Sequence, residues 1–119
     1  MKLPNHQNAI ASERKLAGYL LSSSHTYGRH KAAFFTSFGF SADAWEALAQ
    51  ALLDHASKNE VVRIEDSPFG KRYIVEGELS APDQRKPRVR AIWFIETGED
   101  VPHLVTAYPL EKAYSASRD

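Results

Sequence analysis

Apolar residues recur every three or four positions through the first half of the chain, which is the spacing of an amphipathic helix. Ser12 is a typical N-cap residue, and Leu16, Tyr19 and Leu20 follow it at helical spacing. The polar run Ser22–Ser24 then interrupts the pattern. We therefore expect a first helix that begins after Ser12 and ends at this run.

A second helix is predicted from Tyr27 to Phe38, because Phe34 and Phe38 lie four residues apart and share one face. Gly39 stands where a left-handed C-cap residue ends many helices, and Phe40 can fold back over the last turn. A third helix should follow, capped by Ser41 and ending at Lys58-Asn59. Its apolar stripe is the clearest in the chain and comprises Trp45, Leu48, Ala49, Leu52 and Ala56.

The second half of the chain changes to the alternation of apolar and polar residues that is typical of strands. Segments rich in proline and glycine separate these runs and predict turns. The third run becomes apolar on both faces, which favours a central strand. The four predicted strands are Val61–Ile64, Tyr73–Leu79, Arg88–Ile95 and Leu104–Tyr108.

This order predicts an α+β fold in which three N-terminal helices pack on a four-stranded antiparallel meander sheet. A chain of 119 residues forms a single domain, residues 1–119. We expect residues 1–10 to be an extended lead-in and residues 110–119 to be a frayed tail. The sheet face away from the helices is a candidate binding surface.

Composition narrows the function classes only a little. Lys plus Arg equals Asp plus Glu at 15 each, so the basic excess of many nucleic-acid-binding proteins is missing, although a local basic patch remains compatible. The chain has no cysteine, which removes disulfides, thiolate catalysis and cysteine zinc sites. No apolar run approaches the ~20 residues of a membrane span, and no signal peptide is evident. We expect a cytoplasmic protein that needs no membrane.

The stretch from His25 to Phe40 concentrates the residues that carry chemistry. No phosphate-binding glycine loop, nucleophile elbow or metalloprotease motif is present, and the spacing of His25 and His30 suits no metal, so no metal and no cofactor are expected. Metal-free cleavage of RNA needs a base for the 2′-hydroxyl, an acid for the leaving 5′-oxygen and cations for the phosphate. His25, Arg29, His30 and Lys31 supply these types within seven residues.

Other residues could complete such a site. Gly28 would let a phosphate approach the backbone N–H groups at the start of the second helix. Tyr73, Trp93 and Tyr108 offer aromatic rings on which bases could stack, and Arg88 and Arg90 share one face of their strand and could meet phosphate.

The same residues also have purely structural explanations. His25 could make a local hydrogen bond at the helix entry, His30 could cover Phe34, and the Lys31 stem could lie along the core edge. Arg88 and Arg90 could pair with glutamates of the neighbouring strand. Trp45 and Trp93 are better explained as core residues, and His55 and His103 have no partner that the sequence reveals.

Several blocks in order resemble a bacterial family of small domains of unknown function, over residues 3–109. That family is similar to the toxin ribonucleases of the barnase, EndoU, colicin and RelE-like superfamily. The blocks are Tyr19-Leu20-Leu21 with His25, Gly28–Ala32 with Phe34-Phe35 and Gly39-Phe40, Phe69-Gly70, Tyr73, Val75–Gly77, Trp93, Glu96–Gly98 and Leu104–Pro109.

The resemblance implies a toxin that acts on RNA, tRNA included, and that has a small neutralising protein partner. His25, Gly28 and Lys31 fall on characteristic positions of the family and His30 on a variable one. His103 stands where an arginine is common, and Ala91 where a threonine is common. His103 could therefore replace a phosphate-binding arginine.

The hypothesis is a metal-independent ribonuclease of the bacterial toxin type that cleaves RNA by attack of the 2′-hydroxyl. Its predicted catalytic residues are His25, Lys31 and Arg29. The alternative is a non-catalytic interaction module, antitoxin-like or accessory to a toxin, that binds a protein through the open sheet face. The predicted substrate-binding residues are Gly28, His30, Tyr73, Arg88, Arg90, His103, Thr106 and Tyr108.

Overall fold

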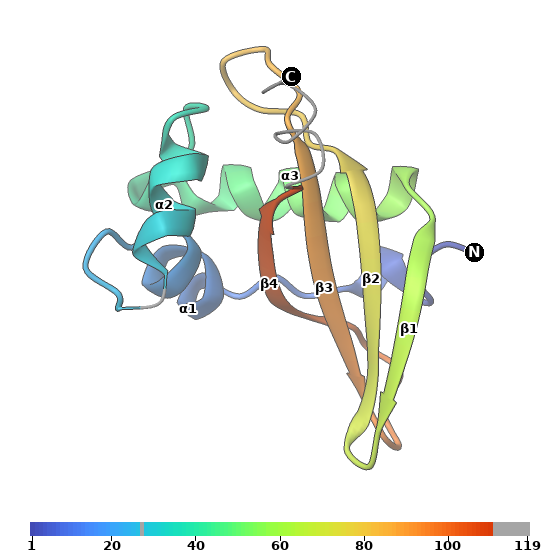
Figure 1. The fold of residues 1–119 in the computed structure, drawn as a ribbon. Helices are drawn as coiled ribbons and strands as arrows, with labels where there is room; N and C mark the ends of the chain where they lie inside the picture. Colours follow the sequence, from blue (N-terminus) through green and yellow to red (C-terminus); the bar gives the residue numbers. More distant parts are fainter. Residues whose placement is uncertain (27, 111–119) are drawn as a thin grey trace.

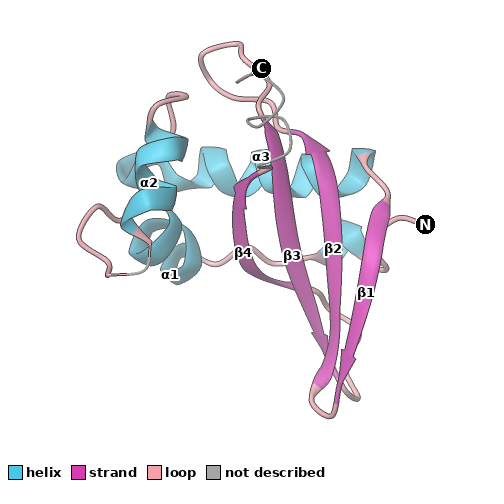
Figure 2. Ribbon diagram, in the orientation of Figure 1, coloured by secondary structure: helices cyan, strands magenta, loops and turns pink. Residues whose placement is uncertain are grey.

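Helical segments precede a four-stranded sheet, so the predicted α+β fold is confirmed (Figure 1, Figure 2). The structure, a computed structural model, describes residues 1–26 and 28–110. The helical segments include short 3₁₀ turns (η1, η3) and one π-helical turn (η2). They are η1 (His6–Asn8), α1 (Glu13–Lys15), η2 (Leu16–Leu20), α2 (Arg29–Thr36), η3 (Ala42–Ala44) and α3 (Trp45–Lys58).

The sheet is the predicted antiparallel meander, with strand order β1-β2-β3-β4. One face packs on α3, and the other lies open toward the viewer in Figure 1. A bulge in β4 interrupts its register with β3 after Ile92, so that Val105 has no direct partner on β3. The strands are β1 (Val61–Ser67), β2 (Gly70–Glu78), β3 (Arg88–Glu96) and β4 (His103–Pro109).

The two outer strands have different surroundings. The start of β4 pairs with Ile10 in a parallel bridge, and α1 and α2 lie beside the strand (Figure 1). On β1, the Val61 N–H donates to the Met1 carbonyl at 2.7 Å. Within residues 1–26 and 28–110, no further strand pairs with the outer side of β1.

The first helix begins as predicted and then widens. The Ser12 hydroxyl accepts a hydrogen bond from the Lys15 N–H at 3.3 Å, which confirms the N-cap. After one turn of α1, the Leu21 N–H donates to the Leu16 carbonyl, five residues back, at 2.8 Å. This π-helical turn buries Leu16 and Leu20 and leaves Tyr19 half-buried at the sheet.

The second helix is shorter than predicted, since α2 begins at Arg29 and ends at Thr36. Tyr27 lies outside the described residues. The predicted C-cap is confirmed, because Gly39 has a φ of 101° and the Phe40 N–H donates to the Phe35 carbonyl at 3.3 Å.

The third helix carries the predicted buried stripe, but its start differs. Ser41 makes no side-chain cap, and the 3₁₀ turn η3 leads into α3 instead. Leu48, Leu52 and the strand residue Trp93 are fully buried, and Trp45 packs partly buried against this core. His55 is 1% exposed and its Nε2 lies 3.0 Å from the Val89 carbonyl, which ties α3 to β3.

Both ends of the described chain are more ordered than the extended lead-in and frayed tail that the sequence predicted. Leu3 is buried in the core and η1 adds a helical turn, so residues 1–10 are not extended throughout. Leu110 is also buried, and its N–H donates to the Arg88 carbonyl at 3.2 Å. Residues 111–119 of the predicted tail lie outside the described residues. None of the described helices is long and apolar enough to cross a membrane.

Candidate functional site

The open sheet face owes its polar character to strand alternation. Val75, Ala91 and Ala107 point into the core, so the residues that alternate with them lie on the other face. At the β4 side, α1, η2, α2 and the loop residues 21–26 form a helical wall that stands beside this face (Figure 1). The residues that share the open face near the wall are Arg72, Glu76, Arg90, Ile92, Thr106 and Tyr108.

Tyr19 is the centre of the contacts between wall and sheet. Its hydroxyl lies 3.4 Å from the Thr106 Oγ1, which joins η2 to β4. The His25 ring packs edge-on against the Tyr19 ring with centroids 5.0 Å apart. The ammonium groups of Lys31 and Lys15 lie 5.3 and 5.5 Å from the centre of the same ring. The wall therefore brings a phenol, an imidazole and two cations to one point.

The electrostatics favour ionisation of this phenol. Burial favours the neutral form, but the hydrogen bond with Thr106 and the nearby Lys31 ammonium outweigh it and lower the pKa of Tyr19 below its ordinary value. Perturbed ionisable groups that face a hollow are frequent at functional sites.

His25 is oriented by the backbone. The Gly28 N–H donates to the His25 Nδ1 at 3.1 Å, as the local interpretation of this histidine predicts. Because Nδ1 accepts this bond, the hydrogen-bond pattern assigns the proton of the neutral ring to Nε2. Nε2–H is therefore the donor of the neutral His25 ring.

Gly28 has a packing role that the sequence hypothesis did not include. A Cβ at this position would lie 2.2 Å from the Tyr19 carbonyl oxygen, so only glycine permits this approach of α2 to η2. Its own N–H donates to the His25 Nδ1, and the approach of a phosphate to the backbone at the start of this helix stays a prediction. Gly28 acts on the site through the positions of Tyr19 and His25.

Lys31 lies half-buried between two aromatic rings. Its ammonium is 5.3 Å from the Tyr19 ring centre and 5.9 Å from that of Tyr108. Arg90 lies 5.7 Å from Tyr108 on the other side, and forms an ion pair with Glu76 at 2.6 Å. Hydrogen bonds to Tyr108 and Glu76 raise the pKa of Arg90, so its charge is permanent. The predicted cross-strand pairing is thus confirmed for Arg90.

A hollow of ≈ 660 Å³ opens beside Tyr19. Lys31 is not one of its lining residues, but its ammonium lies 5.3 Å from the ring centre of Tyr19, which does line it. The residues that line the hollow come from the helical wall and three strands, and are Arg14, Lys15, Gly18, Tyr19, His25, Arg72, Ile92, Val105 and Thr106.

Several predicted site residues lie elsewhere. Tyr73 is 8% exposed and belongs to the core, because strand alternation turns it to the α3 side, so it is no stacking platform. Arg29 and His30 are exposed on α2 and do not line the hollow. Arg88 is exposed opposite Glu78 on β2. His103 lies on the open face at the start of β4, where it lines a second hollow.

Of the nine residues that line the hollow, only His25 and Thr106 were predicted as site residues, and Tyr19 and Arg72 are among the seven that were not. Tyr19 fitted the apolar stripe of the first helix, and nothing local in the sequence shows that its hydroxyl reaches Thr106. The position of Arg72 on the open face could have been predicted from sequence. Arg72 precedes buried Tyr73 on a strand, so its side chain must face the opposite side of the sheet. Among the described residues, no group of three or more His, Asp or Glu is placed to hold a metal ion.

Comparison with known proteins gives a family and a fold. Residues 2–111 match a family described as "Domain of unknown function (DUF6883)". No curated protein matches the chain. A chain from the solved contact-dependent growth inhibition toxin–immunity protein complex of Klebsiella pneumoniae 342 superposes with a TM-score of 0.64 and 18% sequence identity. The match covers 87% of this chain and 95% of the other, so the two share a fold over nearly their whole length.

Proposed function

The chain belongs to the family of domains of unknown function DUF6883, and we propose that it is a metal-independent ribonuclease of the bacterial toxin type. One observation carries the proposal. Tyr19 contacts His25 and Lys31 within the helical wall and Thr106 on the sheet, beside a hollow. A proton acceptor, an N–H donor and a cation at one point are what 2′-hydroxyl attack on a phosphodiester needs.

In the proposed reaction the ribose 2′-oxygen attacks phosphorus and the bond to the 5′-oxygen breaks. Tyr19, whose pKa is lowered despite burial by the hydrogen bond with Thr106 and the nearby Lys31 ammonium, accepts the 2′-hydroxyl proton in its phenolate form. The Lys31 ammonium and the His25 Nε2–H stabilise the extra negative charge on the phosphate oxygens, and the leaving 5′-oxygen takes its proton from one of these two donors. The products are a 2′,3′-cyclic phosphate and a 5′-hydroxyl.

The first test is cleavage of total RNA and tRNA by the purified protein in the presence of a chelator. We expect wild type to cleave and Lys31→Ala to lose about a hundredfold or more in rate, the usual cost of removing one charge-stabilising group. Lys58→Ala is the matched control, because Lys58 lies on α3 behind the sheet and pairs with Asp54. It should cleave like wild type.

Intact RNA from a folded wild-type protein would contradict the ribonuclease. Loss of cleavage on chelation would contradict its metal independence. Unfolding of Lys31→Ala, seen by circular dichroism, would show that the Lys31 stem serves the core edge instead.

We also propose a neutralising protein partner for the toxin. The similar solved chain was determined in a toxin–immunity protein complex. Titration of the protein encoded beside this chain into the cleavage assay should abolish activity at a one-to-one ratio. A lack of inhibition at excess would contradict this partner.

The second candidate function is a non-catalytic interaction module. The exposed apolar residues Val62, Ile64 and Phe69, all on β1 or the turn after it, favour it. A folded protein that leaves RNA intact but binds the neighbouring gene product would support this module, and robust metal-free cleavage would exclude it as the primary function.

A further inference from the structure

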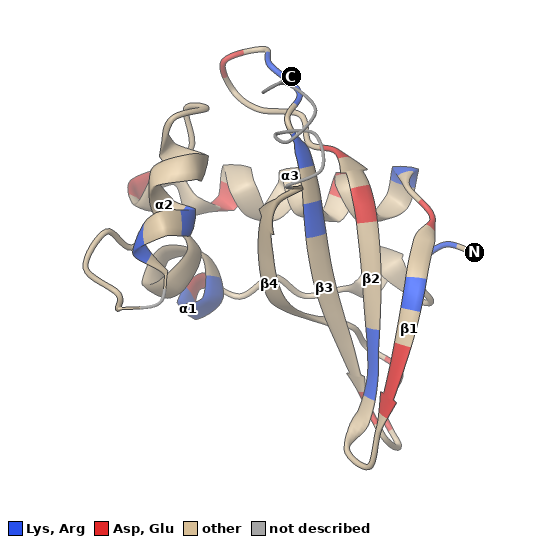
Figure 3. Cartoon of the chain, viewed as in Figure 1, with Lys and Arg blue, Asp and Glu red and all other residues tan. Residues whose placement is uncertain are grey.

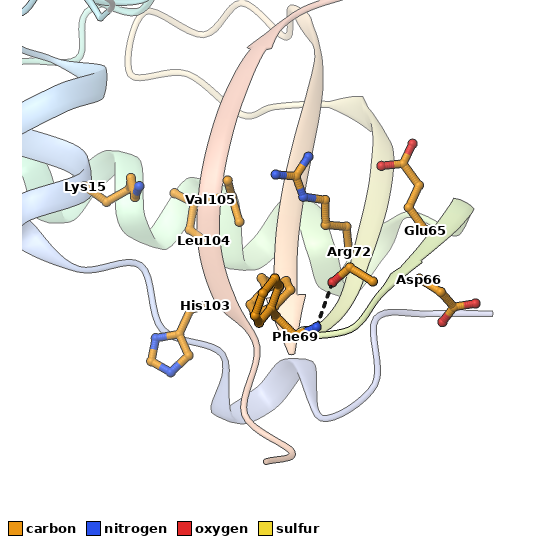
Figure 4. Close-up of a pocket in the computed structure, with 10 residues that line it drawn as sticks. Lys15, Glu65, Asp66, Phe69, Arg72, His103, Leu104 and Val105 are labelled. Carbon is orange, nitrogen blue, oxygen red and sulfur yellow. Dashed lines mark hydrogen bonds between the residues drawn. The ribbon is translucent and has the colours of Figure 1, made fainter. Parts of the chain in front are cut away.

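A second hollow, of ≈ 590 Å³, lies along the open face between the β1–β2 turn and the start of β4 (Figure 4). It shares Lys15, Arg72 and Val105 with the hollow beside Tyr19, so the two adjoin. Together they form a continuous path from the helical wall to the tip of the sheet. A polymer that is cleaved at Tyr19 would have to continue along this path or leave the surface.

Aromatic rings line the apolar part of this second hollow. Phe69 is 74% exposed, which is unusual for a phenylalanine, and Phe94 is half-buried on the open face of β3. The turn that carries Phe69 is well ordered by hydrogen bonds, because the N–H groups of Phe69 and Gly70 both donate to the Ser67 Oγ at 3.2 Å. The exposed ring is therefore presented by a defined turn.

The polar residues of the hollow have both charges. Arg72 and Lys15 lie on the side that adjoins the Tyr19 hollow. Glu65 and Asp66 line the β1 side (Figure 4). Strand alternation places the Glu65 side chain on the open face opposite Arg72 and turns the Asp66 side chain to the other face. The Arg63 guanidinium holds the Glu65 Oε2 at 2.7 Å, which orients this carboxylate at the hollow's rim.

We propose that this hollow binds a nucleotide next to the scissile phosphate, an inference that rests on the proposed ribonuclease function. The base stacks on Phe69 and Phe94, since aromatic side chains accept any base on their faces. Arg72 and Lys15 contact the flanking phosphate. The Glu65 carboxylate, which lies on the open face opposite Arg72, accepts hydrogen bonds from N–H groups on the edge of the base.

This charge arrangement selects among bases. Carboxylates only accept hydrogen bonds, so they favour a base edge with neighbouring N–H donors. Guanine presents two such donors side by side, whereas uracil presents one N–H between two carbonyl oxygens that a carboxylate repels. The site therefore prefers guanine over uracil.

The test measures binding apart from cleavage, with fluorescent 2′-O-methyl oligonucleotides that cannot undergo 2′-hydroxyl attack. Phe69→Ala should weaken the affinity about tenfold, a typical effect of losing one stacking ring, and Arg72→Ala should weaken it several-fold. Val62→Ala and Lys58→Ala are matched controls, because both residues are exposed and neither lines this hollow. Glu65→Gln should reduce the preference of guanine-containing over uracil-only oligonucleotides.

The outcomes separate the two proposals. If wild type cleaves RNA but Phe69→Ala and Arg72→Ala bind like the controls, the nucleotide site is wrong and the ribonuclease stands. If wild type binds oligonucleotides through Phe69 but leaves RNA intact, catalysis is wrong and the nucleotide site stands. Equal affinity of wild type for guanine-containing and uracil-only oligonucleotides would overturn the base preference.

Discussion

Tyr19 shows how one side chain can belong to both the packing and the chemistry of a small domain. Its ring lies against His25 and beneath two lysine ammonium groups, while its hydroxyl bonds to Thr106. A tyrosine with a purely structural role would contribute to packing through its ring alone. The hydroxyl is the part that the proposed reaction uses.

Tyr19→Phe therefore separates the two roles. We expect cleavage to fall by at least tenfold, because the proton acceptor is lost, and the melting temperature to change little, because the ring remains. Since the pKa of Tyr19 is lowered, the phenolate fraction grows as pH rises toward it, so the wild-type rate should rise from pH 6 to pH 9. A pH–rate profile of Tyr19→Phe with the same slope would contradict Tyr19 as the base.

His55 is a buried histidine on which stability should depend. Burial lowers its pKa despite the bond to the Val89 carbonyl, and its Nδ1 has no hydrogen-bond partner among the described residues. Asp54 favours the charged form and Arg88 opposes it. The folded state thus binds the proton more weakly than the unfolded chain, whose histidine pKa is about 6.5.

Stability should consequently be full above about pH 6.5 and should decline as pH falls from there toward the folded pKa. Urea unfolding at pH 8 and pH 5.5 measures the loss. His55→Gln should show a smaller loss between these pH values than wild type, whereas His30→Gln, which changes an exposed histidine, should behave like wild type. An equal loss in His55→Gln would assign the pH dependence to other groups.

At the scale of elements, the site depends on how closely α2 approaches η2. This approach is possible because residue 28 has no side chain. Lys31 lies on the first turn of the same helix, so its distance from Tyr19 depends on this contact.

Gly28→Ala should therefore destabilise the fold by roughly 1–3 kcal/mol, the usual cost of overpacking, and should reduce cleavage by moving Lys31 away from Tyr19. The added Cβ would meet backbone, which cannot move out of the way cheaply. Gly18→Ala is the control, because its Cβ would meet only the Arg14 Cγ at 3.9 Å. It should be neutral or stabilising in chemical unfolding.

The elements themselves could largely be predicted from sequence. The stripe from Trp45 to Ala56 and the β-branched alternation of the strands are local signals, and the C-cap at Gly39 follows from glycine's tolerance of positive φ. The π-helical turn of η2 could not be predicted, because it depends on packing against the sheet. The sequence also misassigned Tyr73, which lies in the core. The structure brings His25, Lys31 and Thr106 together around Tyr19, and their roles in a site stay predictions.

For the whole molecule, the net charge of zero reflects charges of both signs that are spread over the surface. Figure 3 shows basic residues on α1, α2 and β3, and residues of both signs on β1 and β2. Lys15, Lys31 and Arg72 are the basic residues that the proposal places against phosphate along the RNA path. Long-range attraction of RNA should therefore be modest.

Three phosphate contacts predict a slope of about −2 when the logarithm of oligonucleotide affinity is plotted against that of salt concentration. Arg72→Ala should reduce the magnitude of this slope by roughly 0.7, whereas Lys58→Ala should leave it unchanged. Fluorescence anisotropy between 50 and 300 mM salt measures it. A slope several times steeper would place many more lysines and arginines on the RNA.

The unequal outer strands limit how copies of this domain can associate through their sheets. Ile10 and the helices cover β4, whereas the outer side of β1 beyond Val61 has no strand partner in the described part of the chain. A molecule with one unpaired edge strand can pair that strand with the same strand of a second copy, and the resulting dimer has no unpaired edge strand left. Association through β1 would thus end at a closed two-fold dimer and could not propagate into a fibre.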